Sequence, residues 1–169
     1  MSKRVSLRQF QQDLSERLQI ATSQSTVNSR LAIRVGTQNW LVDLADISEV
    51  IAPSPFATVP LTQEWFLGVT NIRGKLFSVI DLPGFAGSGN IQRNPDNRLL
   101  IVHPRFATNA ALLIDQALGL RNIDKMQVET NSAQAEWCVS THRDNDGHIW
   151  FNLNMGALVT NTAFLTVGL

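Results

Sequence analysis

Residues 65–82 read WFLGVTNIRGKLFSVIDL, and they form the stretch around which the rest of this chain is built. They predict two strands joined by a tight turn at Arg73-Gly74, where a positive φ is needed, while Gly68 gives the backbone freedom at the entrance. After the turn, both alternating faces are mostly apolar, which predicts a strand that is covered on both sides. Arg73 and Lys75 place positive charge at the tip of two apolar strands. We therefore expect a contact with a partner there.

The composition is that of a folded, soluble protein with one domain. Its 169 residues are 44% hydrophobic and 17% charged, which is enough for a core of useful size. Fourteen basic and fourteen acidic residues cancel, so no strong field favours nucleic acid as a partner. The single cysteine, Cys138, excludes an internal disulfide and is typical of a reducing compartment. No apolar run fits a secretory signal or a membrane span, so we expect a cytoplasmic protein without direct membrane insertion.

Residues 1–29 are predicted to form a helix and a linker ahead of a domain that covers residues 30–169. Ser6 and Gln9 fit a capping box at the start of the helix. Its apolar stripe recurs at spacings of three and four residues: Leu7, Phe10, Leu14, Leu18 and Ala21. Residues 21–29 are polar and suit a linker. The helix either docks on its own domain or binds a second protein. Deletion of residues 1–28 is expected to leave the domain folded. Loss of the melting transition would show that the helix is part of the core.

From residue 31 onward the apolar residues follow the alternation of strands. The strand-like runs cover residues 31–35, 40–42, 47–51, 98–103, 110–114, 115–120, 137–141 and 148–153. Prolines between residues 53 and 60 predict a loop or a sheet edge ahead of the central hairpin. The run 115–120 is expected to continue the sheet of the run before it, with a bend at Gly119. Asp43 and Asn154 are expected to cap short helical segments.

The fold class follows from the spacing of these runs. Short strands, turn signals about every ten residues and the lack of βαβ alternation are typical of an all-β barrel or sandwich. The two halves of the chain are similar in outline, and residues 83–97, rich in Gly and Asn, form a break between them. The sequence therefore predicts a mainly β protein of two small barrels packed together, with few short helices.

The residues that could bind a metal or a phosphate do not form a known pattern. His103, His142 and His148 are interpreted as surface residues of turns, because a zinc site needs three or four suitably spaced ligands. Residues 144–147, Asp-Asn-Asp-Gly, lack the ligand spacing and the closing Glu of a calcium loop, and a hairpin turn explains them better. The glycines in residues 84–89 have no following Lys-Ser or Lys-Thr. We expect no metal and no cofactor.

No catalytic residue is predicted either. Cys138 beside Trp137 is expected to be a small core residue. Asp81 and Asp115 each follow a strand of buried character, and such aspartates usually accept hydrogen bonds from backbone groups. An alternative function remains: a β-barrel that binds or hydrolyses a small molecule in a cleft between its two halves. The absence of a nucleophile–base pair or metal cluster in the sequence pattern disfavours it.

Glu49 and Arg73 are opposite charges set among apolar strand residues. An exposed ion pair contributes only about 0–1 kcal/mol to stability. If the two residues matter, they would therefore orient a partner more than hold the fold. The plain alternative is an ordinary surface pair or two unrelated charges.

The same central stretch resembles the CheW-like domain, the adaptor module of bacterial chemosensory systems. The resemblance rests on GVTNIRG at residues 68–74 followed by VIDL at residues 79–82. The likeness extends from Leu31 to the C-terminus, where residues 112–115 and 148–153 match later strands of the family. Ser78 stands where a proline is common, and the glycine-rich loop after Leu82 matches no family motif.

The resemblance implies two packed five-stranded SH3-like β-barrel subdomains and a scaffold rather than an enzyme. It implies two partners: the regulatory domain of a CheA-like histidine kinase and the cytoplasmic tip of a methyl-accepting chemotaxis receptor, in membrane-bound arrays. The contact residues that it assigns lie on two strands and the central turn: Ile47, Glu49, Gly68, Val69, Asn71, Arg73 and Gly74.

The N-terminal segment carries a second resemblance. Leu7-Arg8-Gln9-Phe10 and Leu14-Ser15-Glu16-Arg17-Leu18 are similar to the start of the PilI branch of the family. These adaptors belong to the chemosensory system that controls type IV pili and twitching motility. The resemblance implies the same role for this chain.

Overall fold

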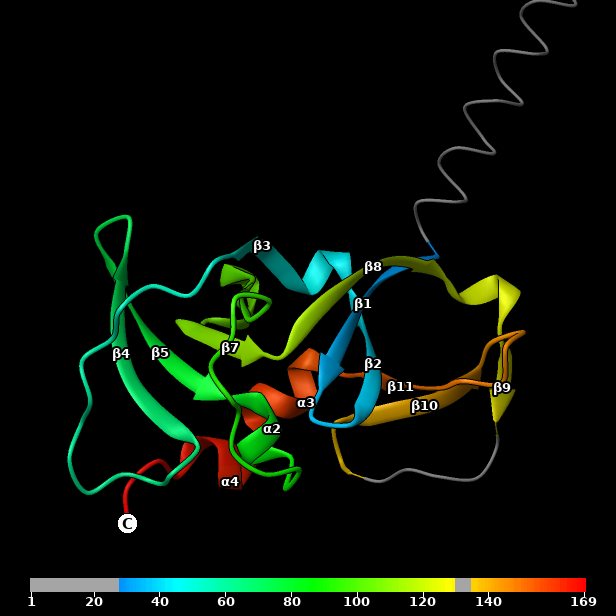
Figure 1. The fold of residues 1–169 in the computed structure, drawn as a ribbon. Helices are drawn as coiled ribbons and strands as arrows, with labels where there is room; N and C mark the ends of the chain where they lie inside the picture. Colours follow the sequence, from blue (N-terminus) through cyan, green and yellow to red (C-terminus); the bar gives the residue numbers. More distant parts are fainter. Residues whose placement is uncertain (1–27, 130–134) are drawn as a thin grey trace, which may run out of the picture.

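The computed structural model describes residues 28–129 and 135–169, and the helix expected near the N-terminus lies outside these ranges. The described residues form two β-sheets that lie side by side, with the helix α3 (Met155–Thr160) between them (Figure 1). Two other short helices are described, α2 (Leu82–Phe85) and α4 (Thr162–Leu165). Short 3-10 segments lie at Leu44–Asp46, Pro104–Phe106 and Ile123–Lys125. The prediction of a mainly β protein with few short helices is confirmed.

The first sheet has five strands in the order β3-β6-β7-β5-β4. Their bounds are β3 Ile47–Ile51, β4 Phe66–Ile72, β5 Lys75–Asp81, β6 Arg98–Val102 and β7 Ala110–Ile114. The pair β5·β7 is parallel, and the other pairs of this sheet are antiparallel. Strands β3 and β4 are therefore its two edges.

The second sheet has six strands in the order β8-β1-β2-β11-β10-β9. Their bounds are β1 Ser29–Val35, β2 Gln38–Asp43, β8 Gln116–Asn122, β9 Gln127–Glu129, β10 Cys138–Arg143 and β11 Ile149–Leu153. The expectation of five strands in each half is thus wrong for this sheet, because the short edge strand β9 adds a sixth. Its polar sequence, Gln-Val-Glu, gave no strand pattern. The SH3-like geometry of each half stays a prediction.

The two sheets do not correspond to the two halves of the chain. The five-stranded sheet takes the middle of the sequence, whereas the six-stranded sheet combines β1 and β2 with β8 to β11. The expectation that residues 115–120 continue the sheet of β7 is therefore wrong, since β8 pairs with β1. The crossing occurs at Asp115. Its backbone N–H donates to the carbonyl of Arg34 (3.1 Å), and its carboxylate accepts from the N–H of Gly36 (2.6 Å).

The central hairpin forms as predicted. Strands β4 and β5 pair antiparallel and are joined at Arg73 and Gly74, whose φ angles of 52° and 83° are both positive, as a type I′ turn requires. From Phe77 onward the residues of β5 are buried or half-buried on both faces. Leu76 departs from this expectation, since it is 63% exposed.

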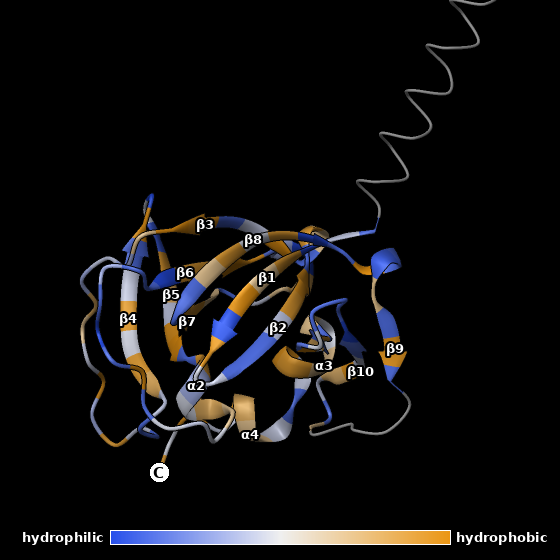
Figure 2. Cartoon of the chain, turned by 45° about the vertical axis from the view of Figure 1, so that its right-hand side comes forward, coloured by the Kyte–Doolittle hydropathy of each residue, from blue (hydrophilic) through white to orange (hydrophobic). Residues whose placement is uncertain are grey.

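The main core lies between the two sheets and draws residues from both of them. It contains Leu31, Ile33 and Val35 of β1 together with residues of β7 and the helices α3 and α4. Figure 2 shows hydrophobic residues on the strands and on α3 in the centre of the molecule. A second core of six buried residues lies on the other face of the five-stranded sheet: Phe77, Val79, Leu99, Ile101, Ala111 and Leu113. A small cluster lies on the other face of the six-stranded sheet, with Ala32, Leu41 and Trp150 at its centre.

The helix caps predicted at Asp43 and Asn154 are present, whereas the capping box at Ser6 lies outside the described residues. The carboxylate of Asp43 accepts from the N–H of Ala45 (2.9 Å), and the side-chain oxygen of Asn154 accepts from the N–H of Ala157 (3.0 Å). Asp81, buried at the end of β5, accepts from the N–H groups of Gly84 and Ile91, both at 2.9 Å. Asp81 and Asp115 therefore bind backbone groups, as expected for aspartates at strand ends.

Strand β10 contains two residues whose burial was considered in the sequence analysis, Cys138 and His142. Cys138 is buried in the main core, as predicted. His142, interpreted from the sequence as a surface residue of a turn, is instead buried within β10. Two causes lower the pKa of His142 below its ordinary value: burial is the larger, and the nearby positive charge of Arg30 is the smaller.

Among the helices in the described part of the chain, none has the length and apolar character that a membrane crossing requires.

Candidate partner-binding site

The predicted contact residues gather at one end of the five-stranded sheet, where the tip of the β4–β5 hairpin projects beyond the other strands (Figure 1). The turn is held by Asn71, whose side-chain oxygen accepts a hydrogen bond from the N–H of Gly74 (2.8 Å). This bond spans the turn that carries Arg73. Asn71 thus acts in the turn itself, whereas Arg73 points outward with 77% of its side chain exposed.

Arg73 forms a two-point ion pair with Glu49 of β3. Its Nη1 donates to Oε1 of Glu49 (2.9 Å), and its Nη2 donates to Oε2 (2.8 Å). The planar guanidinium matches a carboxylate in this geometry, which gives directional specificity as well as attraction. The Glu49 side chain is only 25% exposed, so the pair is anchored on one side and open on the other. The structure brings together two charges that lie 24 positions apart in the sequence.

The ion pair joins the two edges of the five-stranded sheet. Glu49 lies on the edge strand β3, and Arg73 lies at the tip of the hairpin that contains the opposite edge strand β4. The register of β3 against β6 shifts between Ile47 and Glu49, which leaves Ser48 as an extra residue. Such a bulge redirects the side chains that follow it. The Ser48 hydroxyl donates to the carbonyl of Ile101 (3.3 Å), which fixes the bulge just ahead of Glu49.

Gly68 lies on the edge strand β4, where it allows the loop at Ala57 to approach the strand closely. Its φ is 137°, and a Cβ atom there would lie 2.0 Å from the carbonyl oxygen of Ala57. Without a side chain at this position, the loop residue Ala57 exchanges two backbone hydrogen bonds of 2.8 Å with Val69. Gly68 is buried beneath this loop. Its role in the structure is to let the loop close against β4, and a direct contact of Gly68 with a partner stays a prediction.

The two apolar contact residues predicted near the Glu49–Arg73 ion pair, Ile47 and Val69, differ in what they pack against. Ile47 is half-buried and packs against the main core, while Val69 is half-buried beside the loop. Two apolar residues that the sequence analysis did not single out are more exposed: Val50 of β3 at 38% and Leu76 of β5 at 63%. Leu76 lies opposite Asn71 in the hairpin, immediately behind the turn. Its exposure follows from the projection of the tip beyond the core, which the alternation of the strand alone does not reveal.

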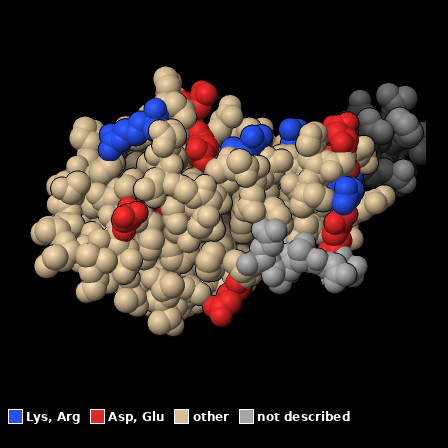
Figure 3. Space-filling model, turned by 60° about the horizontal axis from the view of Figure 1, so that its bottom comes forward, with Lys and Arg blue, Asp and Glu red and all other residues tan. Residues whose placement is uncertain are grey.

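The face that lies at the bottom of Figure 1, around α4 and the C-terminus, contrasts with this charged tip. Figure 3 shows that this face carries few charged side chains, and they lie mainly toward its margins. It includes the exposed residues Leu61, Leu165 and Leu169, of which Leu61 accepts a backbone hydrogen bond from Leu169 (3.0 Å). The contact residues predicted from the sequence do not include any of them.

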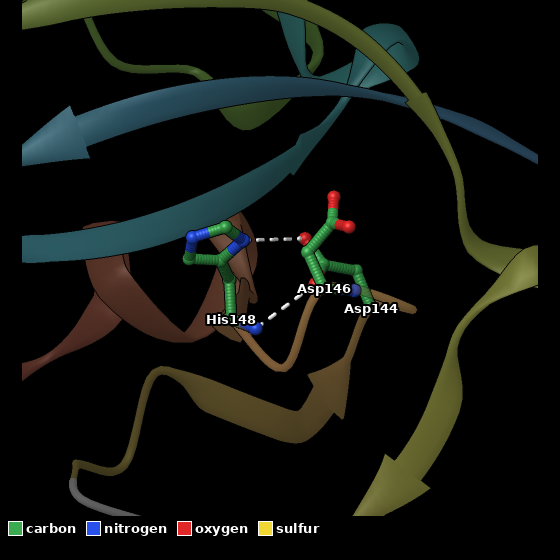
Figure 4. A group of neighbouring side chains, drawn as sticks. All are labelled: Asp144, Asp146 and His148. Carbon is green, nitrogen blue, oxygen red and sulfur yellow. Dashed lines mark hydrogen bonds and ion pairs between the residues drawn. The ribbon is translucent and has the colours of Figure 1, made fainter.

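The turn between β10 and β11 brings together Asp144, Asp146 and His148 (Figure 4). One potential ligand atom from each lies within 4.8 Å of the others, so the group could hold a cation. The Asp144 carboxylate, however, already accepts hydrogen bonds from the N–H groups of Asp146 (3.0 Å) and His148 (2.9 Å) and from Nε1 of Trp150 (2.9 Å). These bonds, with Trp150 first, lower the pKa of Asp144 to about 2. The contacts are those of the hairpin turn that the sequence predicts.

Comparisons with known proteins give a consistent assignment. The family model of the CheW-like domain matches residues 29–163. The protein PilI of Pseudomonas aeruginosa is 27% identical over 106 residues, 63% of this chain and 57% of that protein. The chemotaxis protein CheW of Helicobacter pylori is 32% identical over 68 residues, 40% of this chain and 41% of that protein. The protein FrzA of Myxococcus xanthus is 32% identical over 91 residues, 53% of this chain and 56% of that protein.

The matches thus span about half the length of these relatives. Among solved structures, the scaffolding protein TtCheW of Thermoanaerobacter tengcongensis has the same fold, with a TM-score of 0.67. The match covers 79% of this chain and 94% of that one at 20% identity, which supports the fold alone. Both resemblances seen in the sequence, to the CheW-like domain and to PilI, are confirmed. Because the family model covers most of the chain, the protein belongs to the CheW-like domain family.

Proposed function

We propose that this protein is a non-enzymatic adaptor of a chemosensory system. It links the cytoplasmic tip of a methyl-accepting chemotaxis receptor to the regulatory domain of a CheA-like histidine kinase. Family membership supports the class of protein. The similarity to PilI supports a role in the control of type IV pili and twitching motility. In this role the chain works in the cytoplasm, recruited to membrane-bound receptor arrays, with residues 1–29 as an extension of the domain at 30–169.

The kinase contact is placed at the end of the five-stranded sheet. Its members are the residues that the family resemblance assigns: Ile47, Glu49, Gly68, Val69, Asn71, Arg73 and Gly74. One observation carries this proposal, the two-point ion pair between Glu49 and Arg73, which is partly buried on the Glu49 side and exposed on the Arg73 side. Val50, next to Glu49 on β3, and Leu76, opposite Asn71 in the hairpin, are exposed apolar residues of the same two elements. An interface of this composition combines orientation by charge with burial of apolar surface.

The adaptor mechanism requires that the assembly differ between two receptor states. A scaffold can transmit a signal only if each partner binds one state of the assembly more tightly than the other. The ion pair connects the two edge strands of one sheet, so a partner that engages Arg73 acts on β3 and on the β4–β5 tip together. We infer that this junction is the point at which binding of one partner alters the other contact.

The test is calorimetric titration of the regulatory domain of a CheA-like kinase from the same genome. Wild type is expected to bind with a micromolar Kd, and Arg73→Glu to weaken binding at least tenfold, about 1.4 kcal/mol. Thermal unfolding should hardly change, because an exposed ion pair contributes only about 0–1 kcal/mol. Arg121→Glu makes the same charge change on the six-stranded sheet and is the matched control. Unaltered affinity of Arg73→Glu would remove Arg73 from the interface.

The double variant Glu49→Arg with Arg73→Glu separates two roles of the ion pair. It reverses both charges and keeps the pairing possible. Recovery of kinase binding would mean that the pair acts by holding the junction. Loss equal to that of Arg73→Glu alone would mean that Arg73 contacts the kinase directly. If the wild-type protein binds no such kinase, the result favours one of two other functions. These are a scaffold that binds only a receptor and a β-barrel that binds a small molecule.

A further inference from the structure

The six-stranded sheet carries a pocket of about 860 Å³ on the face that points away from the main core. Strand β1 sends Leu31, Ile33 and Val35 into the main core. The intervening residue Arg34 therefore faces the opposite side, and it lines the pocket. The candidate partner-binding site lies on the other sheet, so the two features are separate.

Three residues stand in a row across the floor of this pocket. The strand register pairs Arg34 of β1 with Asn39 of β2, and Asn39 with Trp150 of β11. All three line the pocket. Cross-strand neighbours in register lie side by side on the same face of a sheet. An arginine, an amide and an aromatic ring are thus placed together, supported by three adjacent strands.

Two polar atoms of this row are buried without a hydrogen-bond partner among the described residues. They are Nε of Arg34 and Oδ1 of Asn39. Arg34 is half-buried, and within residues 28–129 and 135–169 its side chain forms no ion pair. Buried polar groups in proteins are nearly always paired, and an arginine is a strong donor with five N–H groups. The row therefore has unused hydrogen-bonding capacity, a donor on Arg34 and an acceptor on Asn39.

The charge of the wall selects the kind of ligand. Three cationic side chains (Arg34, Arg121 and Lys125) and two acidic ones (Asp144 and Asp146) line the pocket, which leaves one formal positive charge. The carboxylate of Asp144 is occupied by the indole of Trp150 and by the turn. The guanidinium of Arg121 lies 5.7 Å from the centre of the Trp150 ring, which places a cation beside the aromatic member of the row. A single negative charge is matched here better than two.

Part of the remaining wall is apolar. Leu118 and Met126 are half-buried, pack against the small cluster around Trp150, and line the same pocket. A pocket with an apolar wall and a few convergent polar groups is the usual form of a small-molecule site. The volume of about 860 Å³ is in the range of such sites.

We propose that this pocket binds a small organic carboxylate. The carboxylate pairs with the planar guanidinium of Arg34, which presents parallel N–H groups that match two oxygens. The side-chain NH₂ group of Asn39 donates to the same carboxylate, and the apolar or aromatic part of the ligand lies against Leu118, Met126 and Trp150. The site would give the adaptor a small-molecule input on the sheet that does not carry the proposed kinase contact.

The test is an NMR titration of the ¹⁵N-labelled full chain with sodium benzoate. Saturable shifts are expected at the backbone amides of Arg34 and Asn39 and at the indole N–H of Trp150, with a Kd of about 1 mM or tighter. Benzamide has the same shape without the charge and should give no saturation. Phenyl phosphate tests the charge of the ligand, because a dianion should bind more weakly than benzoate.

Substitutions of single arginines test which side chains bind benzoate. Arg34→Gln is expected to weaken benzoate binding at least tenfold, about 1.4 kcal/mol. Arg121→Gln removes an exposed cation of the same wall and should weaken binding about threefold; it decides the matter if Arg34→Gln does not fold. Arg93→Gln removes a positive charge beside Phe56, away from the pocket, and should leave binding unchanged. The proposal is overturned if benzoate gives no saturable shift, if Arg34→Gln and Arg121→Gln bind it like wild type, or if phenyl phosphate binds more tightly.

Discussion

The two sheets of this protein share one core but use their second faces differently. In the five-stranded sheet, β6 sends Leu100 and Val102 into the main core and Leu99 and Ile101 into the second core. In the six-stranded sheet, β1 sends three residues into the main core, but its other face presents Ala32 and Arg34. One sheet is packed with apolar residues on both sides, and the other retains a polar pocket on one side.

This difference in packing determines where functional residues can lie on each sheet. A sheet that is packed on both faces has no room for a ligand, so its functional residues lie at its rim, as Glu49 and Arg73 do. Packing on both sides also makes it a rigid support, which a geometrically specific ion pair requires. A sheet with a small cluster on one face has room for a ligand within the fold. The predictions below test this contrast, from the largest expected effect to the smallest.

Gly68→Ala should have the largest effect on stability. A methyl group there would collide with the carbonyl of Ala57, which lies 2.0 Å from the Cβ position, and the residue has a φ of 137°. We expect a loss of about 4 kcal/mol in the free energy of unfolding, or failure to fold. Gly74→Ala is the control, because φ is also positive (83°) but no atom lies within 4 Å. It should cost only about 1–2 kcal/mol. Urea unfolding followed by tryptophan fluorescence measures both, and equal losses would contradict the close approach of the loop.

Leu99→Ala and Leu41→Ala compare the second faces of the two sheets directly. Both residues are almost fully buried, Leu99 in the second core and Leu41 in the small cluster. Truncation of a buried leucine costs about 2–5 kcal/mol, depending on the cavity that remains. We expect about 3–4 kcal/mol for Leu99→Ala and about 2 kcal/mol for Leu41→Ala, because the site beside the pocket can relax or hydrate. A larger loss at Leu41, measured by urea unfolding, would mean that both faces are packed alike.

Asp144→Asn tests how firmly the wall of the pocket is fixed. Hydrogen bonds, first of all from Trp150, lower the pKa of Asp144 from 3.8 to about 2. The unfolded chain therefore takes up a proton before the folded chain does as the pH falls. The stabilisation by these bonds is present above about pH 4 and is lost between about pH 4 and pH 2.

The stability advantage of wild type over Asp144→Asn should accordingly be constant from pH 5 to pH 7 and shrink below pH 4. Urea unfolding at several pH values measures it. Asp146→Asn is the matched control, since among the described residues the Asp146 side chain forms no hydrogen bond. An advantage that stays constant down to pH 2 would contradict the bonds seen in the turn.

Removal of residues 1–27 should have the smallest effect. The cut keeps Asn28, whose side chain donates to the carboxylate of Asp124 (2.6 Å) and whose carbonyl accepts from the N–H of Ile123 (3.1 Å). We expect the free energy of unfolding to change by no more than about 0.5 kcal/mol, since residues 28–129 and 135–169 form both sheets and three buried clusters among themselves. A loss of more than about 1 kcal/mol in calorimetric or urea unfolding would assign the N-terminal segment to its own domain rather than to a second protein.

Local rules were enough to predict most of the strands and their turns. The hairpin at residues 65–82 could be predicted because alternation, a glycine turn and a strand length are properties of neighbouring residues. The caps by Asp43 and Asn154, and the backbone hydrogen bonds accepted by Asp81, could be predicted for the same reason. The short strand β9 could not, because the edge position of Gln127–Glu129 comes from its pairing with β10. His142 was misplaced because the extent of β10 into the predicted turn is set by that same pairing.

By itself, the sequence determined a mainly β chain, an Arg73-Gly74 turn and a CheW-like signature, since these depend on residues close together in the chain. Only the tertiary structure decided which strands share a sheet, that Glu49 meets Arg73, and that Arg34 faces a pocket. The switch between sheets at Asp115 depends on hydrogen bonds to Arg34 and Gly36, about 80 positions away. Contacts at such separations arise from the curvature and register of whole sheets, and no local spacing encodes them.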